Sequence, residues 1–206
     1  LGDSLGLALE AQKSDADVIV FCGVHFMAET VSVLCPDKTV IVPDLDAGCS
    51  LASMVTPEQI RTWKQDHPKG VVLSYVNCSA AVKAESDYCC TSANAEKILR
   101  AIPEEYEVLF VPDFFLGRYL EEKTGRKLHL WKGFCHAHMK ISSEHIDKLR
   151  LEHPSAEFLM HPECGCLTKS MRYANKILST EGIVKYVNES AASEFIIATE
   201  SALSIV

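Results

Sequence analysis

VPDLDAGC (residues 42–49) and LHLWKGFC (residues 128–135) are two short stretches that each end in a cysteine, and the two cysteines lie 86 residues apart. The similarity continues downstream at the same spacing, where TPEQI (56–60) aligns with SSEHI (142–146). A period of this length indicates a repeated domain rather than a repeated turn. We therefore predict a chain built from homologous copies.

Short apolar runs alternate with amphipathic segments along the whole chain. This alternation predicts right-handed βαβ units with short parallel sheets, and so an α/β fold made of three-layer αβα domains. The expected strands cover residues 17–23, 39–43, 71–76, 107–112, 128–131, 157–160 and 194–199. The expected helices cover 25–34, 92–102, 114–124, 142–152 and 168–178, and further helices open near Ser4, Thr56 and Ser179.

The repeat also predicts the domain organisation. It divides the chain into copies at 1–54, 55–140 and 141–206, related by rotations near threefold. A third cysteine at the same point would fall 86 residues after Cys135, beyond Val206. A first-copy equivalent of Tyr75 would precede Leu1. We therefore expect three homologous domains around a pseudo-threefold axis, with the first and third incomplete here.

Composition argues against several classes of protein. A net charge of −8 is unlike that of a nucleic-acid binder, which is normally basic. No apolar run reaches the roughly 18 residues that span a bilayer, so we expect no membrane partner. Nine cysteines with irregular spacing do not form the pattern of a secreted disulfide framework. The expectation is a protein of the reducing cytoplasm, with some cysteines structural and a few binding metal.

Two of the cysteines are candidate metal ligands. Cys49 and Cys135 each lie in a glycine-containing loop after a strand, one per copy. Single thiolates from separate copies suit a cluster on a threefold axis, and three thiolates would leave a fourth iron open to substrate. Cys164 and Cys166 form a rival C-x-C pair, which is a weak signal, while Cys22 is expected to be a small core residue. The absence of a C-x-x-C pair argues against a zinc ribbon.

A second spacing, of 88 residues, relates hydroxyl residues at expected helix starts. Ser4, Ser92 and Thr180 fall at this spacing, and Ser179 precedes Thr180. A hydroxyl can cap a helix, and the free N–H groups there attract anions. Simple capping is one interpretation. A repeated anion-binding position is the other.

Polar residues also recur where two expected strands end. Tyr75 and Asn77 align with His161 and Glu163 at the spacing of 86 residues. Ligands of α/β sheets bind at the carboxyl ends of strands. There, tyrosine and asparagine can hold a carboxylate, while histidine and glutamate can carry protons. Packing is the alternative for Tyr75 and His161, but the alignment favours a functional site.

Taken together, the motifs resemble those of the quinolinate synthase family, iron–sulfur enzymes of de novo NAD biosynthesis. The resemblance covers essentially the whole chain and keeps the family's order of motifs. The segments that carry it are VIVFCGVHFMAETVSVLCPDKTVIVPDLDAGCSLA (18–52), YVN (75–77), TSANA (91–95), KGFCHAH (132–138), HPEC (161–164) and STEG (179–182).

The resemblance implies three homologous domains and a [4Fe-4S] cluster held by one cysteine from each. Two ligands would be Cys49 and Cys135, with the third beyond the end of this chain. The implied reaction condenses iminoaspartate with dihydroxyacetone phosphate to quinolinate, with loss of phosphate and two waters. An aspartate-oxidising enzyme would be the working partner. The implied catalytic residues are Tyr75, His161 and Glu163, and the implied substrate-binding residues are Ser4, Tyr75, Asn77, Ser92, His161, Glu163, Ser179 and Thr180.

Three alternatives stay open from the residues alone. Cys164 or Cys166 could replace the third cluster ligand. A non-catalytic iron–sulfur electron-transfer module would use the same cysteines but needs a fully ligated cluster and no anion pocket. A zinc-dependent, aldolase-like enzyme acting on phosphorylated ketoses would contain zinc rather than iron and acid-labile sulfide.

Overall fold

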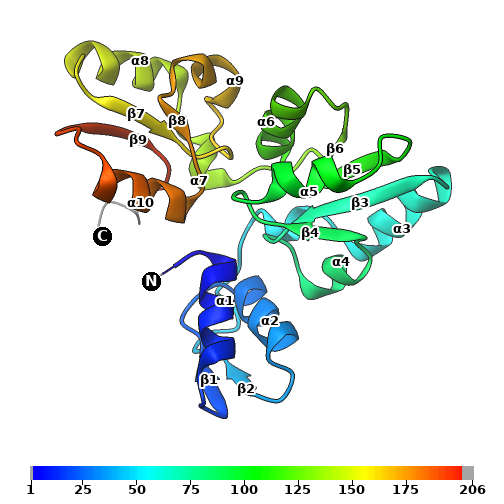
Figure 1. The fold of residues 1–206 in the computed structure, drawn as a ribbon. Helices are drawn as coiled ribbons and strands as arrows, with labels where there is room; N and C mark the ends of the chain where they lie inside the picture. Colours follow the sequence, from blue (N-terminus) through cyan, green and yellow to red (C-terminus); the bar gives the residue numbers. More distant parts are fainter. Residues whose placement is uncertain (1, 201–206) are drawn as a thin grey trace.

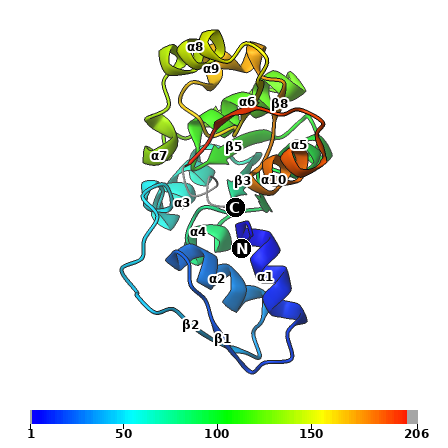
Figure 2. The ribbon, with the colours of Figure 1, turned by 90° about the vertical axis from the view of Figure 1, so that its left-hand side faces the viewer.

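The computed structural model describes residues 2–200, which form three separate parallel β-sheets, each with its own helices. The sheets lie in three lobes that meet in the middle of the molecule (Figure 1). The lobe of the first sheet projects away from the other two, as the side view shows (Figure 2). The α/β class with short parallel sheets is confirmed. The residue boundaries of the copies stay a prediction.

The first sheet pairs β1 (Val18–Val20) with β2 (Thr39–Ile41). Its core is formed with α1 (Ser4–Lys13) and α2 (His25–Leu34), whose small and branched side chains pack together. On the opposite face, the side chains at both ends of each short strand are exposed, which follows from the alternation of side chains along a strand. This lobe is therefore two-layered in the described part of the chain.

The second sheet has the strand order β4-β3-β5-β6 and is covered on both faces. Alternate residues of its central strands enter two different cores. Val72 and Leu109 pack with α3 and α4, whereas Leu73 and Phe110 pack with α5 and α6. This lobe is a three-layer αβα unit, as predicted. Its elements are α3 (Pro57–Asp66), β3 (Gly70–Tyr75), α4 (Ala80–Ala84), β4 (Tyr88–Cys90), α5 (Ala95–Ala101), β5 (Glu107–Val111), α6 (Phe114–Thr124) and β6 (His129–Leu130).

The third sheet has the order β8-β7-β9, with α8 and α9 on one side and α10 on the other (Figure 1). Its main core contains Ile146, Phe158 and Ile196, and Ile183 of α10 is buried as well. The short α7 (His136–Met139) leads into this lobe from the second. Its elements are α8 (Ser143–Glu152), β7 (Glu157–Met160), α9 (Leu167–Ser170), β8 (Lys176–Ile177), α10 (Thr180–Glu189) and β9 (Phe195–Ala198), and the 3₁₀ helices of the chain are η1 (Ala52–Met54) and η2 (Met171–Tyr173).

The second and third lobes share local details at the predicted spacing. The Thr56 side chain accepts a hydrogen bond from Gln59 N at the start of α3, and Ser142 accepts one from His145 N at the start of α8. Such hydroxyl caps satisfy backbone N–H groups that a helix leaves free. The equivalent caps support the homology of these two copies.

The prediction of one helix, over residues 168–178, is wrong. Residues 168–178 do not form a single helix but α9, η2 and the edge strand β8. The reason is pairing with β7, where Met160 stands beside Ile177 and Leu159 beside Lys176. The short strand β4 was not expected either, although Tyr75 pairs with Cys90 there. In both cases a tertiary contact overrides the local preference.

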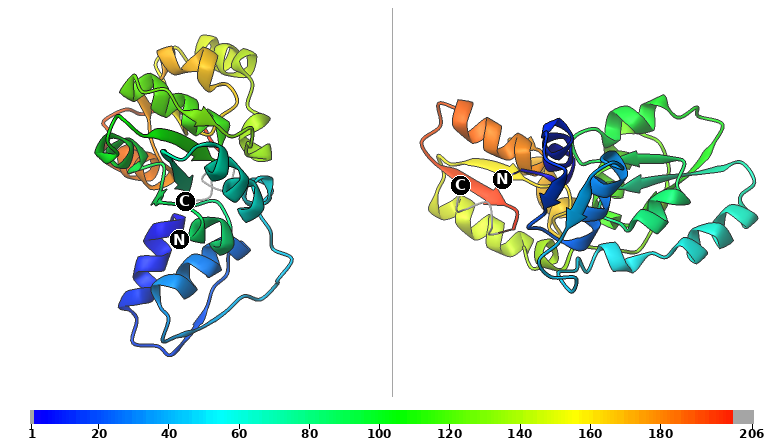
Figure 3. Two further views of the ribbon diagram at one scale, coloured as in Figure 1. Left: turned by 90° about the vertical axis from the view of Figure 1, so that its right-hand side faces the viewer. Right: turned by 90° about the horizontal axis from the view of Figure 1, so that it is seen from below.

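The candidate functional centre lies where the lobes meet. Strands β3 and β7 run toward the middle from opposite sides (Figure 1). Views along two other directions show the three lobes still in contact there (Figure 3). No helix in the described part of the chain is long and apolar enough to cross a membrane.

Candidate active site

A hydrogen bond between two lobes marks the centre. Tyr75 is the last residue of β3, and its hydroxyl donates to Oε1 of Glu163 over 2.5 Å. Glu163 lies just beyond β7 and is 3% exposed. The two side chains come from different sheets, so the contact forms only when the second and third lobes pack together.

Two histidines surround the same carboxylate. His138 of α7 places Nδ1 3.5 Å from Glu163 Oε2, and its Nε2 lies 3.2 Å from the Thr199 hydroxyl. His161 stacks on His138 with ring centroids 5.0 Å apart. Its Nδ1 accepts from the Glu163 backbone N–H over 3.4 Å, so this nitrogen carries no proton. The Glu163 carboxyl is thus surrounded by one phenol and two imidazoles.

Burial makes the carboxyl and the phenol reluctant to ionise. It raises the pKa of Glu163 to about 7, while the Tyr75 hydrogen bond acts in the opposite direction. Burial raises the pKa of Tyr75 well above its usual value, and the nearby Glu163 charge adds to the effect. Tyr75 therefore stays protonated and donates, whereas Glu163 can gain or lose a proton near neutral pH.

Burial has the reverse effect on the imidazoles, because their charged form is the protonated one. It lowers the pKa of His138 to about 4. It lowers the pKa of His161 to about 3, with a smaller contribution from the His138 charge. Both rings are neutral at pH 7, so Glu163 is the group in this cluster that is poised to exchange a proton.

The two candidate metal ligands lie in loops that contact each other. His136 Nδ1, beside Cys135, lies 2.9 Å from the Ser50 hydroxyl, beside Cys49. Both thiols are half-buried. Burial raises the pKa of Cys49 and of Cys135, so without a bound cation both stay protonated. The structure brings the two predicted ligands to the same part of the molecule.

The loop before Cys135 depends on a glycine. A Cβ at Gly133 would stand 2.3 Å from the Pro112 carbonyl oxygen, which belongs to rigid backbone after β5. Gly48 precedes Cys49, and a Cβ there would meet nothing closer than Asp46 O at 3.7 Å, an ordinary contact. Only the first glycine is required by close packing.

We expect Gly133→Ala in the full-length protein to lower the free energy of unfolding by about 1–3 kcal/mol, the range for overpacking. It should also reduce metal occupancy, because the displaced loop carries Cys135. Gly48→Ala is the matched control and should change neither. Thermal unfolding midpoints and metal content of both variants provide the measurement. Equal midpoints for the two variants would contradict this account of the loop.

The surroundings of these thiols fit a bound cation. The Cys135 sulfur, a His138 nitrogen and a Glu163 oxygen all lie within 4.8 Å of one another. Asp113 Oδ2 and His138 Nδ1 are buried and lack a hydrogen-bond partner within residues 2–200. Buried polar atoms are normally paired. Their lack of a partner, together with two nearby thiols, points to a bound group at this position, and thiolates suit iron–sulfur clusters or zinc.

The rival pair of cysteines is placed differently. Cys164 is fully buried, and its sulfur donates to the Ala198 carbonyl over 2.9 Å. Cys166 is buried in the same hydrophobic core of the third lobe. These contacts make both of them packing residues. Cys22, expected in a core, is exposed just beyond β1, so that expectation is wrong.

The remaining predicted residues are less closely engaged. The Ser92 side chain lies within hydrogen-bonding reach of Tyr75. This interaction partly offsets the rise in the pKa of the tyrosine. Asn77 is half-buried two residues beyond β3. Ser179 caps α10 by accepting from Gly182 N, and Thr180 is the first residue of that helix. Leu178 N donates to Met160 O, which places this helix start beside the end of β7.

The prediction of a hydroxyl cap is wrong for the other two helices, α1 and α5. Ser4 is the first residue of α1, but the cap is Asp3, whose carboxylate accepts from Gly6 N. At α5 the preceding turn is closed by the Asn94 side chain, which accepts from Thr91 N, and the helix starts three residues after Ser92. Aspartate and asparagine compete with serine at such positions. Of the three helices α1, α5 and α10, only α10 has a hydroxyl cap, which is Ser179.

Two residues of the centre were missed as site residues. Asp113 follows β5, caps α6 through Leu116 N and is fully buried. Its burial and the nearby Glu163 charge raise its pKa well above the usual value. As a polar residue just after a strand, it fits the rule that identified Tyr75 and His161. His138 had no comparable signal, because a histidine near a cysteine is usually neither a ligand nor a substrate contact.

Comparison with known proteins places the chain in a family. The model of the family described as "Quinolinate synthetase A protein" matches residues 1–205. The chain belongs to this family. A quinolinate synthase from Thermus thermophilus is 53% identical over 202 residues, which cover 97% of this chain and 65% of that protein.

Other members of the quinolinate synthetase A family show the same pattern. The quinolinate synthase of Pyrobaculum aerophilum is 54% identical over 207 residues, covering 97% of this chain and 67% of the relative. The quinolinate synthase of Trichodesmium erythraeum is 52% identical over 200 residues, which cover 97% of this chain and 61% of that relative. The chain thus spans about two thirds of the length of the curated relatives that it matches.

Proposed function

We propose that the protein to which this chain belongs is a quinolinate synthase. It condenses iminoaspartate with dihydroxyacetone phosphate to quinolinate and releases phosphate and two waters. The observation that carries the proposal is the contact of Tyr75 with Glu163 across two lobes, beside Cys135 and His138. This contact unites residues from three separate motifs of the family resemblance at one buried centre.

The proposed cofactor is a [4Fe-4S] cluster. Cys49 and Cys135 would hold it, together with a third thiolate from outside this chain. The half-buried thiols and the unpartnered buried atoms of Asp113 and His138 support a bound group at this position. When bound, a cluster with one iron free of cysteine supplies a Lewis acid to the site.

The proposed roles of this chain's residues follow from their protonation. Glu163 takes up and releases protons, because burial brings its pKa to about 7. Tyr75 donates a hydrogen bond to Glu163 and orients it. His161 is neutral and buried, and its Nδ1 accepts from the Glu163 backbone N–H, so its Nε2–H is the group left to donate to a reacting atom.

Both proposed substrates are anions, and several residues suit them. Ser179 and Thr180 open α10 at the carboxyl edge of the third sheet, where free N–H groups favour carboxylate or phosphate. The side chains of Ser92 and Asn77 lie near the end of β3 and offer hydroxyl and amide groups. Ser4 opens α1, and we propose that it completes the substrate-binding set.

Iminoaspartate is an imine and hydrolyses in water, so an enzyme that oxidises aspartate must supply it. We propose such an enzyme as the working partner. We also propose a cytoplasmic location, where thiols stay reduced. All nine cysteines of the chain are free thiols in the structure.

A zinc enzyme is the second candidate, because the Cys135, His138 and Glu163 atoms offer a sulfur, nitrogen and oxygen donor set. Three such protein ligands with one open position are typical of catalytic zinc. This candidate would be an aldolase-like enzyme acting on phosphorylated ketoses. It requires one zinc per protein and no acid-labile sulfide.

Anaerobic purification of the full-length protein tests both candidates. We expect iron and acid-labile sulfide, and we expect quinolinate to form when iminoaspartate and dihydroxyacetone phosphate are both supplied. Omitting either substrate is the control and should abolish the product. A protein that contains zinc instead of iron, or an iron-loaded protein that forms no quinolinate, would overturn the proposal.

A further inference from the structure

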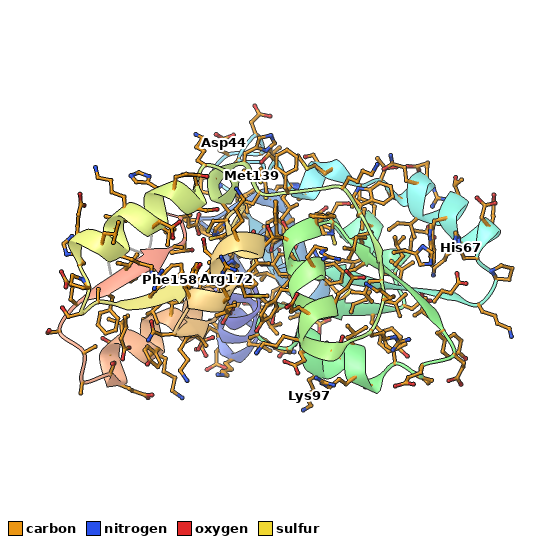
Figure 4. All side chains as sticks on the ribbon, turned by 90° about the horizontal axis from the view of Figure 1, so that it is seen from above. Asp44, His67, Lys97, Met139, Phe158 and Arg172 are labelled. Carbon is orange, nitrogen blue, oxygen red and sulfur yellow. The ribbon has the colours of Figure 1, made fainter. Side chains whose placement is uncertain are left out.

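A second cluster of metal-binding side chains lies at the opposite edge of the second sheet. His67 ends α3, Glu107 begins β5 and His129 begins β6. One ligand atom from each lies within 4.8 Å of the other two. Figure 4 shows His67 at the outer end of its lobe, far from Met139 at the centre. The cluster is therefore separate from the candidate active site.

We propose that His67, Glu107 and His129 bind a divalent transition-metal ion, with zinc as the expected occupant. Two imidazoles and one carboxylate form a ligand set that zinc commonly uses, with water in the fourth position. The exposure of Glu107 and His129 leaves room for that water. The proposal concerns only this distal cluster and does not depend on the proposed reaction.

The distances match a shared ion better than an ion pair. The Glu107 Oε2 atom lies 3.9 Å from His67 Nε2 and 3.5 Å from His129 Nε2. Ligands bound tetrahedrally at about 2.1 Å would be about 3.4 Å apart. Both contacts are too long for direct hydrogen bonds. The Glu107 oxygen therefore lies close to both imidazole nitrogens, at spacings near that of ligands sharing one ion.

The first histidine is already oriented for binding. His67 Nδ1 lies 2.8 Å from the Trp63 carbonyl oxygen, which can only accept, so Nδ1 must carry the proton. Its Nε2 therefore has a free lone pair directed toward Glu107. Metal-binding histidines usually donate their other N–H to a carbonyl or carboxylate in this way. The ring is also stacked on Trp63, with centroids 4.2 Å apart.

A glycine permits this arrangement. A Cβ at Gly70 would lie 2.4 Å from the Trp63 ring and 2.9 Å from the His67 Cβ. Without a side chain there, Trp63 and His67 can pack over the start of β3. The packing restricts the first ligand before any ion binds, which lowers the entropy cost of binding.

The equivalent position in the third lobe provides an internal comparison. His153 lies 86 residues after His67 and also ends its helix. There, however, Nδ1 contacts Glu194 directly at 2.5 Å, as in an ordinary histidine–carboxylate pair. No second histidine joins this pair among the metal-binding groups of the described residues. The repeat therefore contains one histidine–carboxylate contact and one three-ligand cluster.

A bound ion would secure a weak part of the sheet. Strand β6 is at the edge and pairs with β5 through only two residue pairs, one of them Leu109 with His129. The ion would tie β6 to β5 and to the end of α3. Because β6 leads into the loop that carries Cys135, the ion would also stabilise the approach to the central site.

Zinc chloride titrated into the cluster-loaded full-length protein tests the proposal. The calorimetric experiment should be anaerobic, so that the central cysteines stay occupied. We expect His129→Asn to weaken zinc binding by about 100-fold or more, beyond the roughly 10- to 100-fold loss typical of removing an outer partner. Glu107→Gln should have a similar effect. His153→Asn, the matched control, should bind zinc as the unmodified protein does.

Thermal unfolding shows whether a variant that loses zinc binding is still folded. Without zinc, His129→Asn and Glu107→Gln should unfold cooperatively near the normal midpoint. Added zinc should raise the midpoint of the unmodified protein and of His153→Asn, but not that of the other two. The proposal is overturned if the unmodified protein binds no zinc, or if His129→Asn and His153→Asn bind it equally well.

Discussion

Glu163→Gln in the full-length protein should reduce turnover by about 100-fold or more, the usual effect of removing a group that transfers protons. The amide keeps the shape of the side chain and can still accept the Tyr75 hydrogen bond, but it cannot take up a proton. Fold and iron content should therefore be unchanged. Steady-state formation of quinolinate and the iron content of the same sample provide the measurement.

Glu144→Gln is the control for this variant. Glu144 lies in the same lobe, but its side chain is 77% exposed and pairs with Lys169 at 3.7 Å, away from the candidate active site. Turnover of this control should be normal. Near-normal turnover in Glu163→Gln would leave Glu163 as a binding residue at most. Loss of iron together with turnover would instead indicate that the carboxylate supports the bound cofactor.

Cys135→Ser and Cys49→Ser should each abolish the cluster and all turnover in the full-length protein. A serine oxygen is a poor replacement for a thiolate at iron, which prefers soft sulfur ligands in such clusters. Cys22→Ser is the control, because this exposed cysteine lies beyond β1 and belongs to neither candidate metal group. Iron and acid-labile sulfide per protein, measured after anaerobic purification, distinguish the three variants.

Two results would contradict this assignment. Iron retained in Cys135→Ser would show that another residue provides the ligand. Equal iron loss from Cys22→Ser would show that the loss reflects general damage to the protein. A finding of zinc that depends on Cys135 and His138, but not on Cys49, would favour the zinc enzyme.

Much of the fold could be predicted because the longer helices have clear local sequence patterns. The helix expected at 25–34 coincides with α2, and the one at 114–124 coincides with α6. Strands β4 and β8 could not be predicted in this way, because a strand of two or three residues exists only through its neighbour. Asp87, just before β4, accepts a hydrogen bond from the backbone N–H of Val72. Asn175, just before β8, accepts one from the backbone N–H of Phe158. These long-range bonds have no local sequence signal.

The candidate site was predictable to a similar degree. The strand-end rule and the repeat identified Tyr75, His161 and Glu163, all of which the structure brings together. The repeat could not show that Tyr75 reaches Glu163, because that contact depends on how two lobes pack. It also overestimated symmetry at the helix starts, where Asp3 and Asn94 take the place expected for hydroxyl groups.

The contact between Tyr75 and Glu163 has a consequence for ligand recognition. Tyr75 aligns with His161 in the repeat, and Asn77 aligns with Glu163, whereas capping positions such as Thr56 and Ser142 remain chemically alike. At the ends of β3 and β7 the two copies therefore carry different side chains. A site lined by different side chains on similar frameworks distinguishes one end of a molecule from the other, so a small ligand without symmetry would fit in a single orientation.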